Sequence, residues 1–229
     1  MTDKRTAVPH RVPADVADAE RIQAELRDRL VLPDDPIEPP ATVTGLDISY
    51  AIGSDRAVAA AVTVEVGSLR VREVATAPGT VHFPYVPGLL AFREIPLLLA
   101  ALDRLDGRPE VLVCDGYGIA HPRRFGLASH LGVLLDLPAF GVAKNAFVGE
   151  HAEPGPSRGE WSALHDGDEV LGRAVRTRTG VKPVYVSAGH RIGLADATAL
   201  TVRLSTRYRI PEPTRQADII SRQALRQGC

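Results

Sequence analysis

The sequence predicts an α/β domain in which a mixed β-sheet carries helices on both faces. Three stretches rich in valine, threonine and alanine come first and are joined by short glycine-containing turns, which is typical of an antiparallel meander. Amphipathic helical stretches then alternate with short apolar runs, and this alternation indicates crossover connections between buried strands. The composition agrees, because 45% hydrophobic and 24% charged residues are typical of a globular chain.

The first 40 residues are expected to form an appendage to the main domain, which would span residues 41–229. Apolar residues at helical spacing predict a helix over residues 15–30. Four prolines within residues 32–40 exclude a regular helix or a central strand there, so this stretch is expected to be an extended linker.

The meander is expected to consist of strands at residues 42–51, 57–66 and 69–76. In the second strand, four valines and one alanine alternate with other residues and share one face. This pattern predicts a strand with one buried face and one exposed face.

Helices and further strands follow in the rest of the chain. An apolar stripe predicts a helix over residues 92–105, with Pro96 in its first turn or at a kink. The remaining expected elements are strands at 110–114, 139–143, 161–177 and 181–187, and helices at 123–136, 194–206 and 214–227. This order of elements resembles that of a ribonuclease-H-like domain.

The net charge of −1 hides an uneven distribution along the chain. Residues 170–229 contain eleven Lys/Arg and three Asp/Glu, a net charge of +8, although the chain as a whole is close to neutral. A basic region of this kind can attract a polyanion. From charge alone, however, we interpret it as a solvated surface in a chain that favours arginine over lysine.

Composition also predicts the setting of the protein. No apolar run approaches the roughly 18 residues of a membrane-spanning helix, so no membrane partner is expected. Residues 1–14 lack the apolar core of a signal peptide. The two cysteines, Cys114 and Cys229, fit neither a disulfide framework nor a Cys/His metal motif. We therefore expect a reduced, cytoplasmic protein, and a monomer because no heptad or exposed apolar stripe stands out.

Four acidic residues are candidates for chemistry. Asp47 lies in the middle of a predicted strand, where a carboxylate needs a cation, hydrogen-bond donors or solvent. Asp115 ends a buried strand and is followed by glycine, which is where α/β folds place active-site residues. Glu94 lies at the edge of an apolar helix stripe. Asp218 lies one turn into the last helix, with Thr214 as the expected N-cap.

Each acid also has an ordinary structural interpretation. Asp47 could lie on an exposed sheet face, Asp115 could belong to a turn, and the two helix acids could simply interact with the helix dipole. Together, two strand acids and two helix acids could converge on a divalent cation. Because the ligands would be oxygen atoms alone, such a site predicts Mg²⁺ or Mn²⁺ over zinc, and with it phosphodiester hydrolysis.

Two loops and one lysine are further candidates. The loop at residues 83–88 has two prolines and adjacent aromatic residues, which suits insertion between stacked bases, although such aromatics more often pack beneath a domain. Residues 121–124 precede a helix and could hold phosphate or form a surface turn. Lys144 ends a predicted strand and could contact a phosphate oxygen.

Six motifs in a fixed order resemble the endonuclease V family. They are GLDISY, FPYVPGLLAFRE, DGYGIAHPRRFGLASHLG, GVAK, GHRI and PEPTRQAD, which together extend from Gly45 to Asp218. The resemblance implies a ribonuclease-H-like fold and an Mg²⁺ cofactor, with Mn²⁺ as a substitute. It also implies an endonuclease of DNA repair that recognises deoxyinosine and hydrolyses the second phosphodiester bond on its 3′ side. The products would carry 3′-hydroxyl and 5′-phosphate ends.

The resemblance further implies roles for individual residues. The residues that match the catalytic positions are Asp47, Glu94, Asp115, Lys144 and Asp218, of which Asp47 and Asp115 match the principal metal ligands. Tyr85 matches the wedge that separates the strands at the lesion. The positions that match the pocket for the flipped hypoxanthine are Gly88, Leu90, Gly116 and Gly126, and those that match phosphate-side contacts are His121 and Arg123. The main departure is Asn145-Ala146, where other members often have serine or a second basic residue.

Two other functions are compatible with the sequence. An inosine-specific endoribonuclease would have the same acids and pocket but would accept a 2′-hydroxyl group near the cut in RNA. A non-catalytic inosine-binding module would keep the wedge and the pocket but lose an acid, and all four acids are present. Cleavage of matched DNA and RNA strands distinguishes the first alternative from a deoxyribonuclease, and binding without cleavage would indicate the second.

Overall fold

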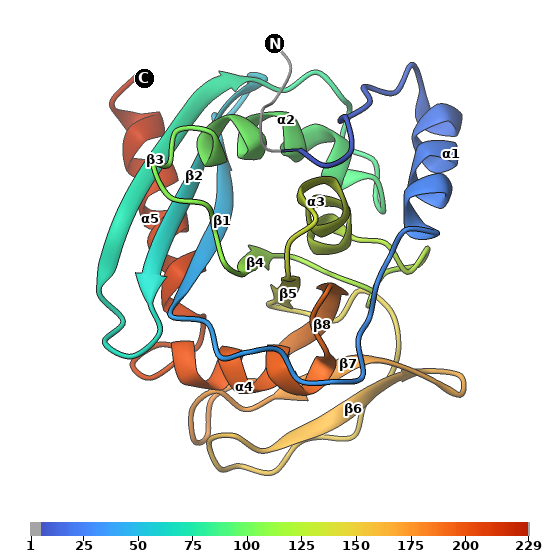
Figure 1. Cartoon of the computed structure of the whole chain (residues 1–229), viewed down its shortest axis with the longest axis vertical. Helices are drawn as coiled ribbons and strands as arrows, with labels where there is room; N and C mark the ends of the chain where they lie inside the picture. Colours follow the sequence, from blue (N-terminus) through green and yellow to red (C-terminus); the bar gives the residue numbers. More distant parts are fainter. Residues whose placement is uncertain (1–5, 229) are drawn as a thin grey trace.

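A single β-sheet forms the centre of the molecule. The computed structural model describes residues 6–228 and contains an eight-stranded sheet in the order β3-β2-β1-β4-β5-β8-β7-β6 (Figure 1). Its strands are β1 (Thr42–Tyr50), β2 (Arg56–Glu65), β3 (Val71–Thr80), β4 (Leu112–Asp115), β5 (Ala139–Ala143), β6 (Trp161–Asp166), β7 (Glu169–Val175) and β8 (Val184–His190). The central strands β1, β4 and β5 run parallel, whereas the strands on either side of them pair antiparallel.

Helices cover both faces of this sheet (Figure 1). They are α1 (Val16–Arg27), α2 (Leu90–Leu102), α3 (Leu127–Leu135), α4 (Leu194–Leu204) and α5 (Glu212–Arg226). On one face, α1, α2 and α3 share a core with Leu46 and Leu112. On the other face, α4 packs on Val113 and Phe140, and α5 packs on β2. The predicted ribonuclease-H-like mixed sheet with helices on both faces is confirmed.

The β2 strand is buried on both faces, so the prediction of one exposed face is wrong. Ala59 and Ala61 belong to the core beneath α2, whereas Ala60 and Val62 pack against α5. The alanines between the valines are small, and they let a helix pack closely on the second face. The face predicted to be exposed is this alanine face, and α2 covers it. Because α2 is a separate element, the local periodicity of β2 does not reveal this second contact.

Other elements also differ from the predictions in their bounds. The stretch expected as one strand at residues 161–177 forms two strands, β6 and β7, because a turn interrupts it. The α2 helix begins earlier than predicted, so Pro96 lies in its second turn. The last helix begins at Glu212, and Thr214 is not its N-cap. Instead, the Thr214 hydroxyl lies within the first turn and donates to the carbonyl of Pro211 at 3.1 Å.

The N-terminal helix packs on the main body of the protein. Its buried apolar residues are Ala19, Ile22 and Leu26, which join the core formed with α2 and α3. The proline-rich linker contains neither helix nor strand, as predicted, and polar contacts fix it to the body; for example, the amide of Ile37 donates to Asp196 Oδ2 at 2.9 Å. The division into an appendage and a domain at residue 40 stays a prediction.

Two further sequence predictions concern membranes and cysteines. Across residues 6–228, no helix combines the length and the apolar character that crossing a membrane requires. Cys114 in β4 is a free, buried thiol. Residues 1–5 and Cys229 lie outside the described part of the chain, so the expectations for the extreme N-terminus and for this second cysteine are not tested.

Candidate active site

Asp47 lies on the face of β1 that α5 covers. Gly45, two residues earlier on this face, permits the close approach, because a Cβ atom there would lie 2.2 Å from the carbonyl carbon of Pro213. The α5 helix therefore brings Asp218 and Ser221 to the strand, and the Ser221 hydroxyl donates to Asp47 Oδ2 at 3.1 Å. The strand carboxylate thus has the hydrogen-bond donor that its position requires.

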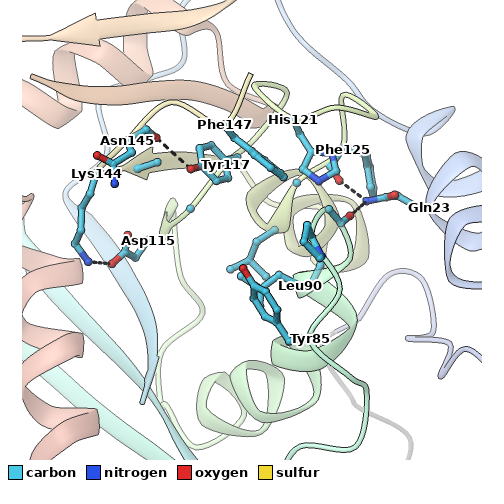
Figure 2. Close-up of a pocket in the computed structure, with 17 residues that line it drawn as sticks. Gln23, Tyr85, Leu90, Asp115, Tyr117, His121, Phe125, Lys144, Asn145 and Phe147 are labelled. Atoms are coloured by element: carbon cyan, nitrogen blue, oxygen red, sulfur yellow. Dashed lines mark hydrogen bonds and ion pairs between the residues drawn. The ribbon is translucent and has the colours of Figure 1, made fainter. Parts of the chain in front are cut away.

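Asp115 and Lys144 lie at the carboxyl ends of the neighbouring parallel strands β4 and β5. The Lys144 ammonium forms an ion pair with Asp115 Oδ2 (Figure 2). The pKa of Lys144 is raised: burial acts to lower it, but the hydrogen bond and the charge of Asp115 outweigh burial. Because 48% of the Lys144 side chain is exposed, the pair is accessible to a ligand from solvent.

The four acids share one electrostatic site. Burial, followed by the charges of Asp115 and Asp218, raises the pKa of Asp47 to about 7. Burial also raises the pKa of Glu94 to about 8, and the charges of Asp47 and Asp115 add to this effect. The Tyr50 hydroxyl donates to Glu94 Oε1 at 2.8 Å and opposes part of the increase in the Glu94 pKa. Each ionised carboxylate makes the next harder to ionise, so the site favours a positively charged partner.

The carboxylate oxygens of this cluster are the type of ligand that a hard divalent cation prefers. Among the described residues, no three His, Cys, Asp or Glu side chains converge closely enough to hold a metal ion, and the Lys144 ammonium contacts Asp115. The acids nevertheless offer only carboxylate oxygens, which Mg²⁺ and Mn²⁺ prefer. A cation bound between them would also relieve the mutual repulsion that raises the pKa of Asp47 and Glu94.

A pocket of about 320 Å³ lies beside the acid cluster (Figure 2). Asp115 and Lys144 line it, so the cluster and the pocket are continuous. Six of the residues predicted for substrate binding also line it: Tyr85, Gly88, Leu90, Gly116, His121 and Gly126. The aromatic side chains of Tyr117 and Phe147 complete a mostly apolar lining, which suits a flat ligand with a few polar edges.

The loop at residues 83–88 divides its two aromatic residues between the core and the pocket. Phe83 packs on Phe92, with ring centroids 5.8 Å apart, whereas Tyr85 is 71% exposed. Tyr85 also lines the pocket, so its ring is available both to solvent and to a ligand that enters (Figure 2). Its role as a wedge stays a prediction.

Residues 121–124 form a loop before α3, which begins four residues later than predicted. Burial and the charge of Arg123 lower the pKa of His121 to about 4, so its ring is neutral at pH 7. Arg123 does not line the pocket; it donates to the carbonyl of Gly88 at 3.1 Å. Arg124 pairs with two carboxylates of the β6–β7 hairpin, so its charge is already balanced. The phosphate-side roles of His121 and Arg123 stay predictions.

An open groove of about 620 Å³ lies on the α5 side of the cluster. Asp47 and Asp218 line this groove together with Arg222 and Arg226. Lys144 lines both the groove and the pocket. The acid cluster therefore lies where the pocket meets a groove with basic side chains, an arrangement that suits an extended polyanion.

The sequence of this chain matches a known protein family. The sequence model of the endonuclease V family matches residues 24–219. This chain belongs to the endonuclease V family. The matched range includes the position of every catalytic and binding residue that the sequence predicts, from Asp47 to Asp218. As a member of the endonuclease V family, the chain is a nuclease.

Relatives of known sequence or structure match nearly the whole chain. Endonuclease V from Streptomyces coelicolor is 56% identical over 228 residues, which is 99% of this chain and 97% of the relative. The crystal structure of endonuclease V from Streptomyces avermitilis has a TM-score of 0.91 at 54% identity, covering 96% of this chain and 97% of that chain. Endonuclease V from Ciona intestinalis, solved in complex with DNA containing an inosine followed by a ribo-adenosine, has a TM-score of 0.78 at 32% identity, covering 93% of this chain and 98% of that chain.

The endonuclease V site also contains residues that the sequence did not single out. Tyr50 and Ser221 hydrogen-bond to the acids. Tyr117 and Phe147 contact each other at the pocket, with ring centroids 5.2 Å apart, and Gln23 reaches the pocket from α1. Tyr50 carried a usable signal, because a tyrosine at a strand end usually finds a partner for its hydroxyl when buried. The sequence gives no such signal for Ser221 and Gln23, since a buried polar residue on an amphipathic helix has the same sequence pattern as a solvent-exposed one.

Proposed function

We propose that this protein is an Mg²⁺-dependent endonuclease that recognises deoxyinosine in DNA and hydrolyses the second phosphodiester bond on its 3′ side. The products would carry 3′-hydroxyl and 5′-phosphate ends, as suits a role in DNA repair. The observation that carries the proposal is the continuity of the acid cluster with the pocket through Asp115 and Lys144. The inosine-containing DNA in the Ciona complex supports the choice of lesion.

The pocket suits a purine that has left the base stack. Hypoxanthine has O6 and an N1–H donor where adenine has an amino group and an acceptor, so main-chain groups can distinguish the two bases. Gly88 and Gly116 have φ angles of +83° and +154°, and they bring main-chain groups to the pocket without side chains. A mismatched inosine also costs less to flip than a paired base, and Tyr85 would fill the gap that it leaves.

The acids would form the metal site. Asp47 and Asp115 would hold Mg²⁺, with Mn²⁺ as a substitute, and Glu94 and Asp218 would complete the set. When bound, the cation supplies charge neutralisation at the phosphate and a water molecule of lowered pKa. This assignment is supported by the resemblance of the motifs and by the electrostatic repulsion among the four carboxyl groups.

The basic side chains of the protein would orient the scissile phosphate. Lys144 pairs with Asp115, and we expect its ammonium to turn toward a phosphate oxygen when DNA enters. Arg222 and Arg226 line the neighbouring groove and would contact the backbone on one side of the cut. These contacts would fix the register of the strand, while the pocket reads the base.

Nicking of a labelled duplex tests the proposal. The substrate contains a single deoxyinosine, and a matched duplex with deoxyadenosine at that position is the control. We expect one nick at the second phosphodiester bond 3′ to deoxyinosine in Mg²⁺, and loss of nicking in Asp47→Asn and Asp115→Asn. A nick that does not require a divalent cation, or equal nicking of the control duplex, would contradict the proposal.

Cleavage of inosine-containing RNA is the second candidate function. The DNA in the Ciona complex has a ribo-adenosine directly after the inosine, which favours testing a 2′-hydroxyl group near the cut. Side-by-side cleavage of matched DNA and RNA strands compares the two substrates. A non-catalytic module is less well supported, because the four acids share one electrostatic site. We further propose a cytoplasmic monomer, and sedimentation of the purified chain tests the oligomeric state.

A further inference from the structure

We propose that Gln23 is a positioning residue that holds the two walls of the pocket at a fixed separation. The proposal rests on the proposed function, because it concerns the base that this pocket would receive. One wall is the loop that contains Tyr85 and Gly88, and the other is the segment at residues 116–126 that leads into α3. Gln23 belongs to neither wall, since it projects from α1 (Figure 2).

The Gln23 side chain bonds both walls at once. It is 1% exposed, and its Nε2 group donates to the carbonyl of Phe125 at 2.7 Å and to the carbonyl of Gly88 at 3.1 Å (Figure 2). Its Oε1 atom accepts a hydrogen bond from Arg123 Nε. Both ends of the amide therefore have partners inside the protein, and those partners come from the two walls.

The Gly88 carbonyl is the point where these contacts converge. Arg123 Nη2 donates to it at 3.1 Å, and a hydrogen bond between His121 and the Gly88 main chain opposes part of the fall in the His121 pKa. Gly88 has a φ angle of +83°, and a Cβ atom there would lie 3.0 Å from Arg123 Nη2. The Gly88 carbonyl oxygen thus connects the loop that carries Tyr85 to the opposite wall. Gln23 adds a further hydrogen bond to this oxygen, and its donor comes from a helix outside both walls.

The α1 helix gives Gln23 a fixed origin. Its buried apolar residues are Ala19, Ile22 and Leu26, which lie in the core shared with α2 and α3. At the rim, the Glu20 carboxylate pairs with Arg123 Nη1 at 3.2 Å, and 49% of the Glu20 side chain is exposed. A helix anchored by apolar contacts holds a buried amide in one place, as a positioning group requires.

Loss of this amide should weaken binding of the base more than it slows hydrolysis. Among the described residues, the hydrogen bonds of the Gln23 side chain go to the pocket walls and not to the acid cluster. Without the Nε2 donors, the carbonyls of Phe125 and Gly88 each lose a buried partner, and the walls are free to separate. The fit to a flipped base then weakens, whereas hydrolysis of DNA that has bound correctly proceeds at a similar rate.

Two substitutions and a control test the positioning role. Gln23→Met keeps a similar volume but removes the donors and the acceptor. Gln23→Glu keeps an acceptor for Arg123 but removes the donors and directs a carboxylate at two carbonyl oxygens. The control, Glu20→Gln, weakens the ion pair with Arg123 at the rim and leaves the Gln23 amide unchanged.

Single-turnover nicking of a deoxyinosine duplex over a range of enzyme concentrations provides the first measurement. Both Gln23 variants should raise the half-saturating enzyme concentration about tenfold, with a maximal rate within about threefold of wild type. Glu20→Gln should change neither value by as much as about threefold. An unchanged half-saturating concentration in the Gln23 variants, or a loss confined to the maximal rate, overturns the proposal.

Hydrogen exchange of the DNA-free protein gives a readout that does not depend on activity. Faster exchange limited to residues 85–90 and 116–127 in the Gln23 variants supports the positioning role, even if wild-type protein fails to nick inosine DNA and the proposed function is wrong. Unchanged exchange in both segments overturns the positioning role. Faster exchange across the whole sheet also overturns it, because that result marks a general loss of stability. If Gln23→Met does not fold, Gln23→Glu decides by the same measurements.

Discussion

Protonation of a buried histidine should make the fold sensitive to acid. His130 on α3 is 1% exposed. Its ring centroid lies 5.0 Å from that of Phe92, 5.4 Å from that of Phe125 and 6.1 Å from that of His10. Neither ring nitrogen of His130 has a hydrogen-bond partner among the described residues. Burial, followed by the charge of His10, lowers the pKa of His130 from 6.5 to about 3.

The size of the effect follows from proton binding in the two states. In the unfolded chain His130 takes up a proton below about pH 6.5, whereas the folded protein keeps the ring neutral down to about pH 3. The stabilising contribution of the neutral ring is therefore complete above pH 6.5 and declines as the pH falls from 6.5 toward 3. Because pH 5.0 lies about 1.5 pH units below the pKa of the unfolded chain, the loss there is ~2 kcal/mol of unfolding free energy.

Urea unfolding at pH 8 and pH 5 measures this effect, with His130→Phe as the comparison. Phenylalanine keeps an aromatic ring among its neighbours and does not titrate. Between the two pH values, wild type should lose ~2 kcal/mol more unfolding free energy than the variant, because the variant has no imidazole at position 130 that takes up a proton on unfolding. An equal pH dependence of the two proteins would refute the reasoning, since His130 would then bind protons equally in the folded and unfolded states.

Substitutions at three positions in the site give further predictions. Gly45→Ala would place a Cβ atom 2.2 Å from Pro213, so the displaced α5 should lower the Tm and abolish nicking; wild-type values for both would show that the close approach is unnecessary. Tyr85→Ala should weaken binding of deoxyinosine DNA about tenfold by the loss of one stacking contact, with cation binding unchanged in calorimetry. Equal affinity for the duplex would exclude the wedge. Lys144→Ala should slow single-turnover nicking roughly a hundredfold, and Lys144→Arg should restore part of the rate; a fully active alanine variant would leave the lysine beside Asp115 without a role.

Periodicity and turn residues predicted most elements, because these signals are local. Strand β5 has the predicted bounds, and α4 begins where predicted at Leu194. The burial of the alanine face of β2 was not predictable from its periodicity, since it depends on packing against α2, a separate element. The start of α5 was also missed, because Thr214 is a good capping residue by type, whereas Pro211 and Pro213 set the backbone of the first turn.

The same difference between local and distant contacts explains which residues of the site could be predicted. Asp47 and Asp115 were identifiable because a carboxylate within or at the end of an apolar strand is unusual by itself. Other side chains of the site form hydrogen bonds to groups that are far away in the sequence, as Tyr50, Ser221 and Gln23 do. The Gly88 carbonyl, which accepts a hydrogen bond from Gln23, is one such group. Only the fold shows what these side chains contact.

Cation binding tests most directly whether acids from separate segments form one metal site beside the pocket. Mn²⁺ can be titrated into complexes with a deoxyinosine duplex whose scissile linkage resists hydrolysis, using wild type and the double variant Asp47→Asn/Asp115→Asn. Saturable binding by the wild-type complex and its loss in the double variant are the predicted result. Equal saturable binding by both complexes would place the cation elsewhere and contradict the central claim.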